Sequence, residues 1–135
     1  MGRPQSLSSC RVMKPARVLV VDDDRFLRKA LTYVLCRHGY EVIEASDGEE
    51  GLAAIRESRP DLVYLDVVMP KIDGFEVTRL VRKDDELKGT RIVLLTAMGQ
   101  DTDRAKGEEA GADDFLTKPF SPSNIIKRTR IMLDQ

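Results

Sequence analysis

Apolar runs and amphipathic segments alternate along this chain from about residue 17 onward. Four consecutive apolar residues stand at positions 18–21, 62–65 and 92–95. Short continuous apolar runs are typical of strands buried on both faces of a parallel sheet. Two weaker segments complete the set, so we expect strands at about 17–22, 41–45, 62–66, 91–96 and 115–117.

A helical pattern follows each expected strand. In the first helix, apolar residues recur in pairs every four positions, from Phe26 and Leu27 to Leu35, as one helical face requires, and Gly39 ends it. The segment 46–49 has the form of a capping box that opens the second helix. The inward residues of the later helices are expected to be Leu52, Ile55, Phe75, Val77, Leu80, Val81, Ile125, Ile126, Met132 and Leu133.

These segments make five β-α units in one domain of about residues 17–134. Right-handed crossovers arrange such a series as a doubly wound, five-stranded parallel sheet with helices on both faces, a three-layer α/β/α fold. Residues 1–16 are rich in Pro, Ser, Gln and basic residues, and we expect them to form a disordered N-terminal tail.

The fourth helix, at about residues 101–110, has the weakest apolar face. Its apolar content is little beyond Ala105 and Ala110, and Gly107 in its middle costs about 1 kcal/mol relative to Ala. A helix that buries so little is expected to move easily.

Composition and charge narrow the function classes. The chain has 135 residues, of which 41% are hydrophobic and 33% charged, and its net charge is −1. This balance gives no bulk electrostatic reason for nucleic-acid or membrane binding. No apolar run suits a membrane span or a secretory signal, so we expect a cytoplasmic protein. Cys10 and Cys36 are interpreted as a tail thiol and a small buried side chain, not as a disulfide.

Chemically active residues stand where the expected strands end. Asp22, Asp23 and Asp24 follow the first strand, and Asp66 ends the third. Thr96 and Lys118 follow the fourth and fifth strands. Because parallel strands bring their carboxyl ends to one edge, these groups should meet there.

A cluster of carboxylates requires a counter-ion. Two carboxylates about 4 Å apart repel by roughly 4 kcal/mol at an effective dielectric of about 20. Lys118 supplies one positive charge, and Mg²⁺, which prefers oxygen ligands, suits the rest. Carboxylate, magnesium, hydroxyl and ammonium together indicate phosphoryl transfer with an Asp as the nucleophile.

Four stretches of the chain resemble the receiver domain of two-component response regulators, over about residues 16–133. They occur in the family's order and at its intervals: Val18-Leu19-Val20-Val21-Asp22-Asp23-Asp24, Asp66-Val67-Val68-Met69-Pro70 with Asp73-Gly74, Leu95-Thr96-Ala97, and Gly111 to Phe120. The resemblance implies the flavodoxin-like (CheY-like) fold and a phosphoacceptor domain rather than an enzyme with a separate substrate.

The resemblance also implies roles for particular residues. Asp66 would accept a phosphoryl group from a sensor histidine kinase or a histidine phosphotransfer protein. Asp23, Asp66 and the Val68 carbonyl would bind Mg²⁺, and Asp22 would assist through water. Thr96 and Lys118 would bind the phosphoryl oxygens.

Further implications concern switching and the bond before Pro119. Phe115 would turn inward when Thr96 moves toward the phosphoryl group. The Lys118–Pro119 bond would be cis. Signalling would pass through the face of the fourth helix, fifth strand and fifth helix to a downstream protein partner or to a second copy in a homodimer.

Some positions depart from the family pattern. Glu108 replaces a larger apolar residue that the family often has, which agrees with a mobile fourth helix. Val68 and Met98, each two residues beyond a site residue, are apolar and cannot orient a hydrolytic water, so we expect a long-lived phosphoryl group. No effector domain follows the last helix, so we expect a stand-alone receiver.

Three other interpretations remain at this stage. A haloacid-dehalogenase-type phosphatase would place a second Asp where Val68 stands. A flavodoxin-like flavin binder would have a hydroxyl- and glycine-rich loop where Asp22, Asp23 and Asp24 stand. A pure interaction module that keeps the fold without phosphorylation is disfavoured by the complete acceptor site and is not excluded.

Overall fold

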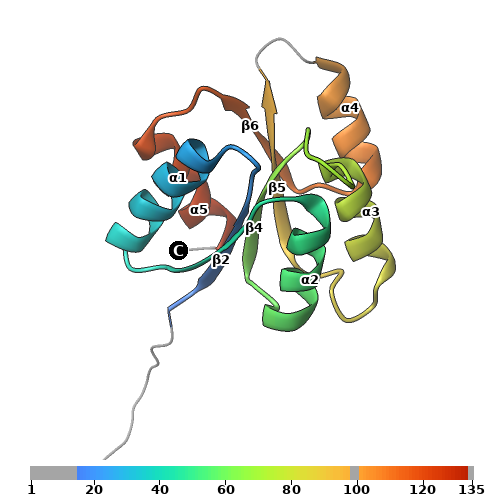
Figure 1. Ribbon diagram of the computed structural model, residues 1–135, viewed down its shortest axis with the longest axis horizontal. Coiled ribbons are helices and arrows are strands. Elements are labelled where there is room, and N and C mark those ends of the chain that lie inside the picture. The colour runs from blue at the N-terminus through green and yellow to red at the C-terminus, as the bar shows by residue number, and fades with distance from the viewer. Residues whose placement is uncertain (1–14, 98–100, 134–135) are drawn as a thin grey trace, which may run out of the picture.

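A five-stranded parallel sheet forms the centre of the computed structural model, which describes residues 15–97 and 101–133 but not the side chains of 101–103 (Figure 1). The expectations for residues 1–14, including Cys10, and for Met98 lie outside the described residues. The strand order is β3-β2-β4-β5-β6. The strands are β2 (Arg17–Val21), β3 (Glu41–Ala45), β4 (Leu62–Asp66), β5 (Arg91–Ala97) and β6 (Asp114–Lys118).

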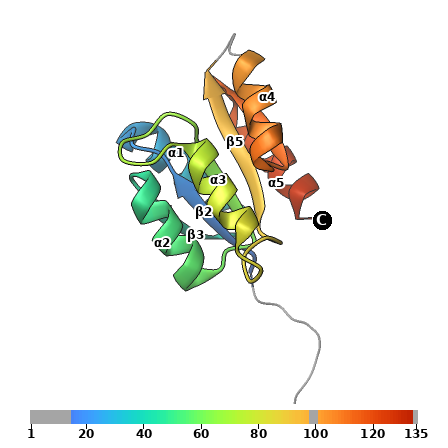
Figure 2. The ribbon, with the colours of Figure 1, turned by 90° about the vertical axis from the view of Figure 1, so that its right-hand side faces the viewer.

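Helices cover both faces of this sheet. α1 and α5 lie on one side, and α2, α3 and α4 lie on the other, where Figure 2 views them side by side. The helices are α1 (Arg25–Arg37), α2 (Gly48–Ser58), α3 (Gly74–Lys83), α4 (Asp101–Ala110) and α5 (Pro122–Met132). The predicted three-layer α/β/α fold is confirmed. Within the described part of the chain, no helix is long and apolar enough to cross a membrane.

The two cores follow from the alternation of side chains along each strand. Leu19 and Val21 pack toward α2 and α3, whereas Val18 and Val20 pack toward α1 and α5. Strands buried on both faces need an unbroken apolar run, which explains the pattern in the sequence. Tyr64 is fully buried on the α5 side, where its hydroxyl lies 2.7 Å from Thr129 Oγ1.

Two expectations for α1 are wrong. Phe26 is 88% exposed, because it lies in the first turn, next to the loop that leaves β2, and the buried face begins only at Leu31. Cys36 is exposed and free, since it directly follows the buried Leu35 and successive helical residues point to different sides.

The capping motif of α2 is displaced by one residue from its expected position. Asp47 is the N-cap and accepts a hydrogen bond from Glu50 N at 2.8 Å. The Glu50 carboxylate in turn accepts from Ser46 N at 2.8 Å. Asp and Ser are comparable N-caps, so local sequence did not discriminate between the two registers.

α4 packs closely against Phe115 and Leu94 because Gly107 has no side chain. Gly107 is buried, and a Cβ atom there would lie 2.3 Å from Phe115 Cε2 and 2.8 Å from Leu94 Cδ1. Arg82 of α3 anchors the turn after α4, since it donates to Gly111 O at 2.7 Å and pairs with Asp113 at 2.8 Å. Gly107 therefore allows close packing, a benefit that helix propensity does not reveal. The mobility of α4 stays a prediction.

Helix propensity and close packing predict changes of opposite sign in the free energy of unfolding when Gly107 is replaced by Ala. Helix propensity alone predicts that Gly107→Ala raises the free energy of unfolding by about 1 kcal/mol. The contact with Phe115 instead predicts a loss of about 1–3 kcal/mol from overpacking. Urea unfolding of the variant and of Glu109→Ala, an exposed control expected to change by less than about 0.5 kcal/mol, decides between them. A stabilised Gly107→Ala variant would contradict the packing.

Candidate functional site

The carboxyl edge of the sheet gathers most of the expected site residues. Asp22, Asp23 and Asp66 each offer one carboxylate oxygen, and these atoms all lie within 4.8 Å of one another. Lys118 Nζ lies 3.2 Å from Asp66 Oδ2 and 3.4 Å from Asp22 Oδ2. Side chains from the carboxyl ends of β4 and β6 and from the loop after β2, which are far apart in the sequence, thus meet.

Strand order brings these groups together. β4 lies between β2 and β5, so Asp66 at its end is flanked by the loop that follows β2 and by Leu95 of β5, its register partner. Lys118 ends β6, where it pairs in register with Ala97. Thr96 is buried one residue beyond the register partner of Asp66, at the same edge.

The loop after β2 divides its three aspartates between two tasks. Asp22 is fully buried, and its Oδ1 accepts from Asp24 N at 2.9 Å. Asp24 is the N-cap of α1 and accepts from Phe26 N and Leu27 N. Asp24 therefore stabilises the helix, while Asp22 and Asp23 face the cluster.

Burial and like charge perturb the Asp66 carboxylate. Burial, and then the nearby Asp22 carboxylate, raise the pKa of Asp66 to about 6, against the opposing effect of Lys118. Burial lowers the pKa of Lys118, but Asp66 and Asp22 outweigh it, so its pKa is raised. Lys118 therefore stays protonated at neutral pH, and Asp66 is the group under electrostatic strain.

The oxygen donors at this edge fit a hard divalent cation. Asp22 Oδ2 is buried and accepts no hydrogen bond from any described residue, although the Lys118 ammonium lies nearby. Burying a carboxylate oxygen that accepts no hydrogen bond is costly. A cation with several oxygen ligands would satisfy Asp22 and reduce the repulsion within the cluster, as Mg²⁺ does in sites with few carboxylates.

Phe115 links the site to the surface around α4. It is buried beneath Gly107, and the Arg104 guanidinium carbon lies 4.8 Å from its ring centroid. Phe115 stands three residues before Lys118 on the same strand. The Lys118–Pro119 peptide bond is cis, as the resemblance implied.

Lys71, for which the sequence predicted no role, helps hold the loop after Asp66. Lys71 has φ 76°, and its ammonium lies 3.6 Å from Asp47 and 3.7 Å from Glu49. Gly48 allows the same loop to approach α2, since a Cβ there would lie 2.0 Å from the carbonyl oxygen of Ile72. An isolated lysine in a turn carries no sequence signal for this contact.

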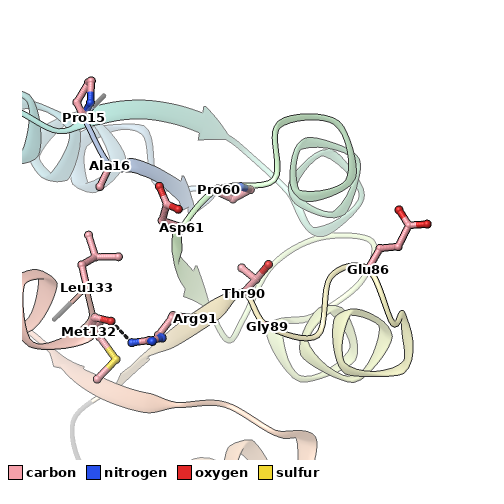
Figure 3. A pocket seen from close by; sticks show the side chains of 10 residues that line it. All are labelled: Pro15, Ala16, Pro60, Asp61, Glu86, Gly89, Thr90, Arg91, Met132 and Leu133. Atoms are coloured by element: carbon pink, nitrogen blue, oxygen red, sulfur yellow. Dashed lines mark hydrogen bonds between the residues drawn. The ribbon is translucent and has the colours of Figure 1, made fainter. Parts of the chain in front are cut away.

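A cavity of about 690 Å³ lies where β4 and β5 begin (Figure 3). Asp61, Thr90 and Arg91 line it together with Met132, whose carbonyl oxygen accepts a hydrogen bond from Arg91. None of the expected site residues lines this cavity. The cavity and the cluster of candidate site residues therefore lie at opposite edges of the sheet.

Comparison with known proteins agrees with this geometry. The family model described as the response regulator receiver domain matches residues 18–130. The probable transcriptional regulator ycf27 of Guillardia theta is 46% identical over 117 residues, which cover 87% of this chain and 45% of that protein. The alkaline phosphatase synthesis transcriptional regulatory protein PhoP of Bacillus subtilis is 44% identical and is covered to 48%. The chain thus spans about half the length of these curated relatives.

Solved structures show the same fold over almost the whole chain. A response regulator from Chloroflexus aurantiacus has a TM-score of 0.86 and 40% identity, and the match covers 90% of this chain and 100% of that one. The chemotaxis response regulator CheY4 of Vibrio cholerae has a TM-score of 0.84 and 37% identity, with 89% and 100% covered. With its acidic cluster and strand order, the chain belongs to the response regulator receiver domain family, a phosphoacceptor module of two-component signalling rather than a substrate-turnover enzyme.

Proposed function

We propose that Asp66 accepts a phosphoryl group from a histidine kinase or a histidine phosphotransfer protein, in a reaction that depends on Mg²⁺. One observation carries this proposal: Asp22, Asp23 and Asp66 converge within 4.8 Å, and Lys118 Nζ lies 3.2 Å from Asp66. As in other receivers, which partner with histidine kinases, we expect the reaction to take place in the cytoplasm.

Metal binding would use the ligands that the family pattern assigns. Asp23, Asp66 and the Val68 carbonyl would hold Mg²⁺, Asp22 would assist through water, and the bound ion would supply positive charge against the phosphoryl oxygens. The buried Oδ2 atom of Asp22 supports this assignment, because it has no hydrogen bond among the described residues.

The chain's own residues would carry the transfer. A carboxylate oxygen of Asp66 attacks phosphorus, the new O–P bond forms, and the N–P bond of the phosphohistidine breaks, so the imidazole leaves. Lys118, already placed against Asp66, would bind one phosphoryl oxygen, and the Thr96 hydroxyl would donate to another. These groups position the phosphoryl group and neutralise it.

Signal output would use the face formed by α4, β6 and α5. Phe115 and Lys118 lie on β6, so a change at the phosphoryl site reaches this face through one strand. The face carries charge of both signs, with exposed Glu108 and Glu109 on α4 and, on α5, the partly exposed Arg128, which pairs with Asp114 of β6. Such a face suits a downstream protein or a second copy of the chain.

The likeness to named relatives suggests the process that is controlled. The two curated relatives described above are named transcriptional regulators. We therefore propose transcription as the favoured output, through a downstream domain or protein that reads the phosphorylation state. A pure interaction module is disfavoured, because such a module would not need a buried carboxylate cluster that costs stability.

Phosphorylation is tested by intact mass after incubation with acetyl phosphate. We expect the wild-type chain to gain the mass of one phosphoryl group with Mg²⁺ and to gain none with EDTA. Asp66→Asn is expected to gain none in either condition, because an amide oxygen is not a nucleophile.

The matched control for this measurement is Asp85→Asn, which removes a carboxylate whose side chain is 91% exposed and far from the cluster in the sequence. It should be phosphorylated like the wild type. Lys118→Met should be phosphorylated on the order of a hundredfold more slowly, because it lacks one oxygen-binding cation. Phosphorylation of Asp66→Asn at the wild-type level would refute the assignment of the acceptor.

Ionisation of Asp66 should make the free energy of unfolding depend on pH. Its pKa in the folded protein, about 6, lies above the ordinary value for Asp. Between about pH 4 and pH 6 the folded state therefore binds more protons than the unfolded state, and this contribution to stability is lost as pH rises. In EDTA, Asp66→Asn should gain about 2–3 kcal/mol of unfolding free energy relative to wild type between about pH 4 and pH 7.

Urea unfolding at several pH values measures this difference, with Asp85→Asn as the surface control. Asp85→Asn should follow the wild-type curve. A difference between Asp66→Asn and wild type that stays constant from acid to neutral pH would show that Asp66 ionises normally.

The lifetime of the phosphoryl group should depend on the residue at position 68. The Val68 side chain is 75% exposed and cannot orient a hydrolytic water by hydrogen bonding. Val68→Asn supplies a donor and an acceptor there, and one hydrogen bond worth about 1.4 kcal/mol in the transition state corresponds to about tenfold faster hydrolysis. Decay of the phosphorylated mass after removal of the donor measures it, with Val68→Leu as the control. Equal lifetimes for Val68→Asn and wild type would contradict this role.

A further inference from the structure

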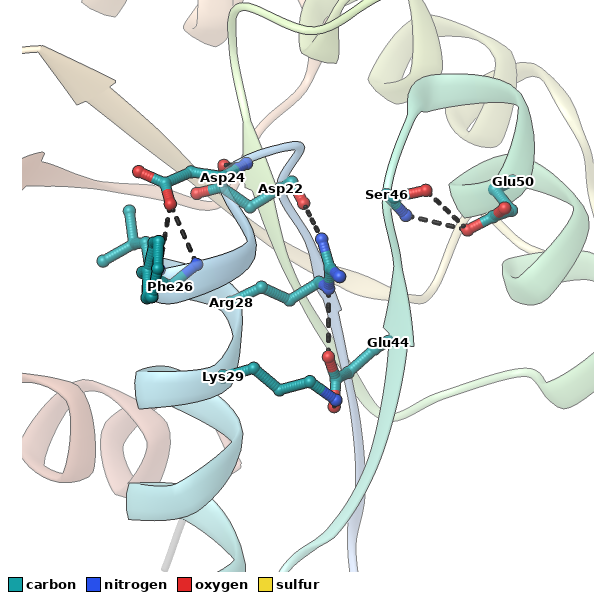
Figure 4. A network of polar contacts seen from close by, with 9 residues as sticks. Asp22, Asp24, Phe26, Arg28, Lys29, Glu44, Ser46 and Glu50 are labelled. Carbon is teal, nitrogen blue, oxygen red and sulfur yellow. Dashed lines mark hydrogen bonds and ion pairs between the residues drawn. The ribbon is translucent and has the colours of Figure 1, made fainter.

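The loop that carries Asp22 and Asp23 rests on a polar network between α1 and β3 (Figure 4). Arg28 Nη1 donates to the carbonyl oxygen of Asp22 at 2.8 Å, and Arg28 Nε donates to Glu44 Oε1 at 3.0 Å. Lys29 Nζ lies 3.1 Å from the other Glu44 oxygen. One guanidinium group therefore joins the acidic loop to β3.

The carbonyl that Arg28 binds belongs to the peptide unit between Asp22 and Asp23. Because a peptide unit is planar, holding its oxygen sets the direction in which the chain leaves Asp22 and enters Asp23. Asp22 N in turn donates to Ala45 O at 3.1 Å. The backbone of Asp22 is thus held from both sides, and two members of the carboxylate cluster depend on the orientation of one peptide plane.

This contact is specific rather than a loose surface pair. The Arg28 side chain is only 14% exposed, whereas that of Lys29 is 58% exposed. Arg28 offers several N–H groups in a rigid plane and uses one for each partner, which a Lys ammonium cannot reproduce. Burial raises the pKa of Glu44, but hydrogen bonds from Lys29 and Arg28 outweigh it and lower the pKa, so Glu44 remains charged at neutral pH.

We propose that Arg28 is a positioning residue for the metal and phosphoryl site, and that Glu44 acts through it. Arg28 holds the Asp22–Asp23 peptide so that both carboxylates face Asp66, and it does not itself touch the metal or the phosphoryl group. This inference rests on the proposed Mg²⁺-dependent function. If Arg28 acted only through its charge, its removal would strengthen Mg²⁺ binding, because a cation near the cluster repels Mg²⁺. If Arg28 positions the loop, its removal should weaken Mg²⁺ binding.

Calorimetric titration of the full chain with MgCl₂ tests the proposal. Arg28→Met keeps a long side chain and loses both hydrogen bonds, so we expect Mg²⁺ to bind about tenfold to a hundredfold more weakly. Glu44→Met should weaken binding in the same direction. The double variant should bind no more weakly than Arg28→Met alone, because the two residues act as one unit.

A second readout needs no metal. Asp24 N donates to Asp22 Oδ1, so a loosened loop should expose the Asp24 amide. In EDTA, we expect faster hydrogen exchange at Asp24 in Arg28→Met and in Glu44→Met than in the wild type. Exchange in the middle of α3, on the opposite face of the sheet, should be unchanged, which separates loss of positioning from loss of global stability.

Lys29→Met is the matched control, since it removes a cation from the same carboxylate without reaching the loop. It should bind Mg²⁺ within about twofold of the wild type. Arg28→Met affinity equal to or tighter than wild type overturns the proposal, as does an equal loss in Lys29→Met. If Arg28→Met does not fold, unchanged affinity and Asp24 exchange in Glu44→Met overturn it. A wild-type chain that binds no Mg²⁺ overturns the proposed function as well.

Discussion

Repulsion among three carboxylates at one edge of the sheet is the constraint on which the site depends. Asp22, Asp23 and Asp66 lie within 4.8 Å, and Lys118 is the cation set against two of them. The cost is visible in the raised pKa of Asp66 and in the buried Oδ2 atom of Asp22, which accepts no hydrogen bond from any described residue. A site strained in this way would respond strongly to added positive charge or to the proposed conversion of Asp66 into an acyl phosphate.

The fold holds this cluster by rigid means. Asp66 ends a strand that is buried on both faces and paired on both sides, so it cannot withdraw from its neighbours. The acidic loop is held by backbone contacts to β3 and by Arg28, while Asp24 caps the helix that follows. Rigid placement explains how like charges stay close without a compensating partner for each.

The same strand serves the site and the proposed output surface. β6 carries Phe115 under α4 and Lys118 at the cluster, and Asp114 of this strand pairs with Arg128 of α5 at 2.6 Å. The close approach of α4 depends on Gly107, which leaves room for the Phe115 ring. Chemistry at the edge and packing around α4 therefore share one short element.

Sequence by itself determined the fold class and the location of the candidate site, because both follow from patterns among residues that are close together in the chain. Unbroken apolar runs identified the buried strands, and the bounds expected for β3, β4 and α4 agree with the structure. Acidic, hydroxyl and basic residues at successive strand ends indicated one edge. The wrong expectations, the burial of Phe26 and Cys36 and the register of the α2 cap, came from the same local patterns. These patterns do not determine at which residue a buried face or a cap begins.

Only the tertiary structure decided which groups meet and which residues support them. The division of labour between Asp24 and its two neighbours, and the contact of Arg28 with Asp22, depend on how α1 lies against β3. The benefit of Gly107 depends on a ring eight positions away on another element. Such contacts join residues through strand order and close packing, and no periodicity along the chain records them.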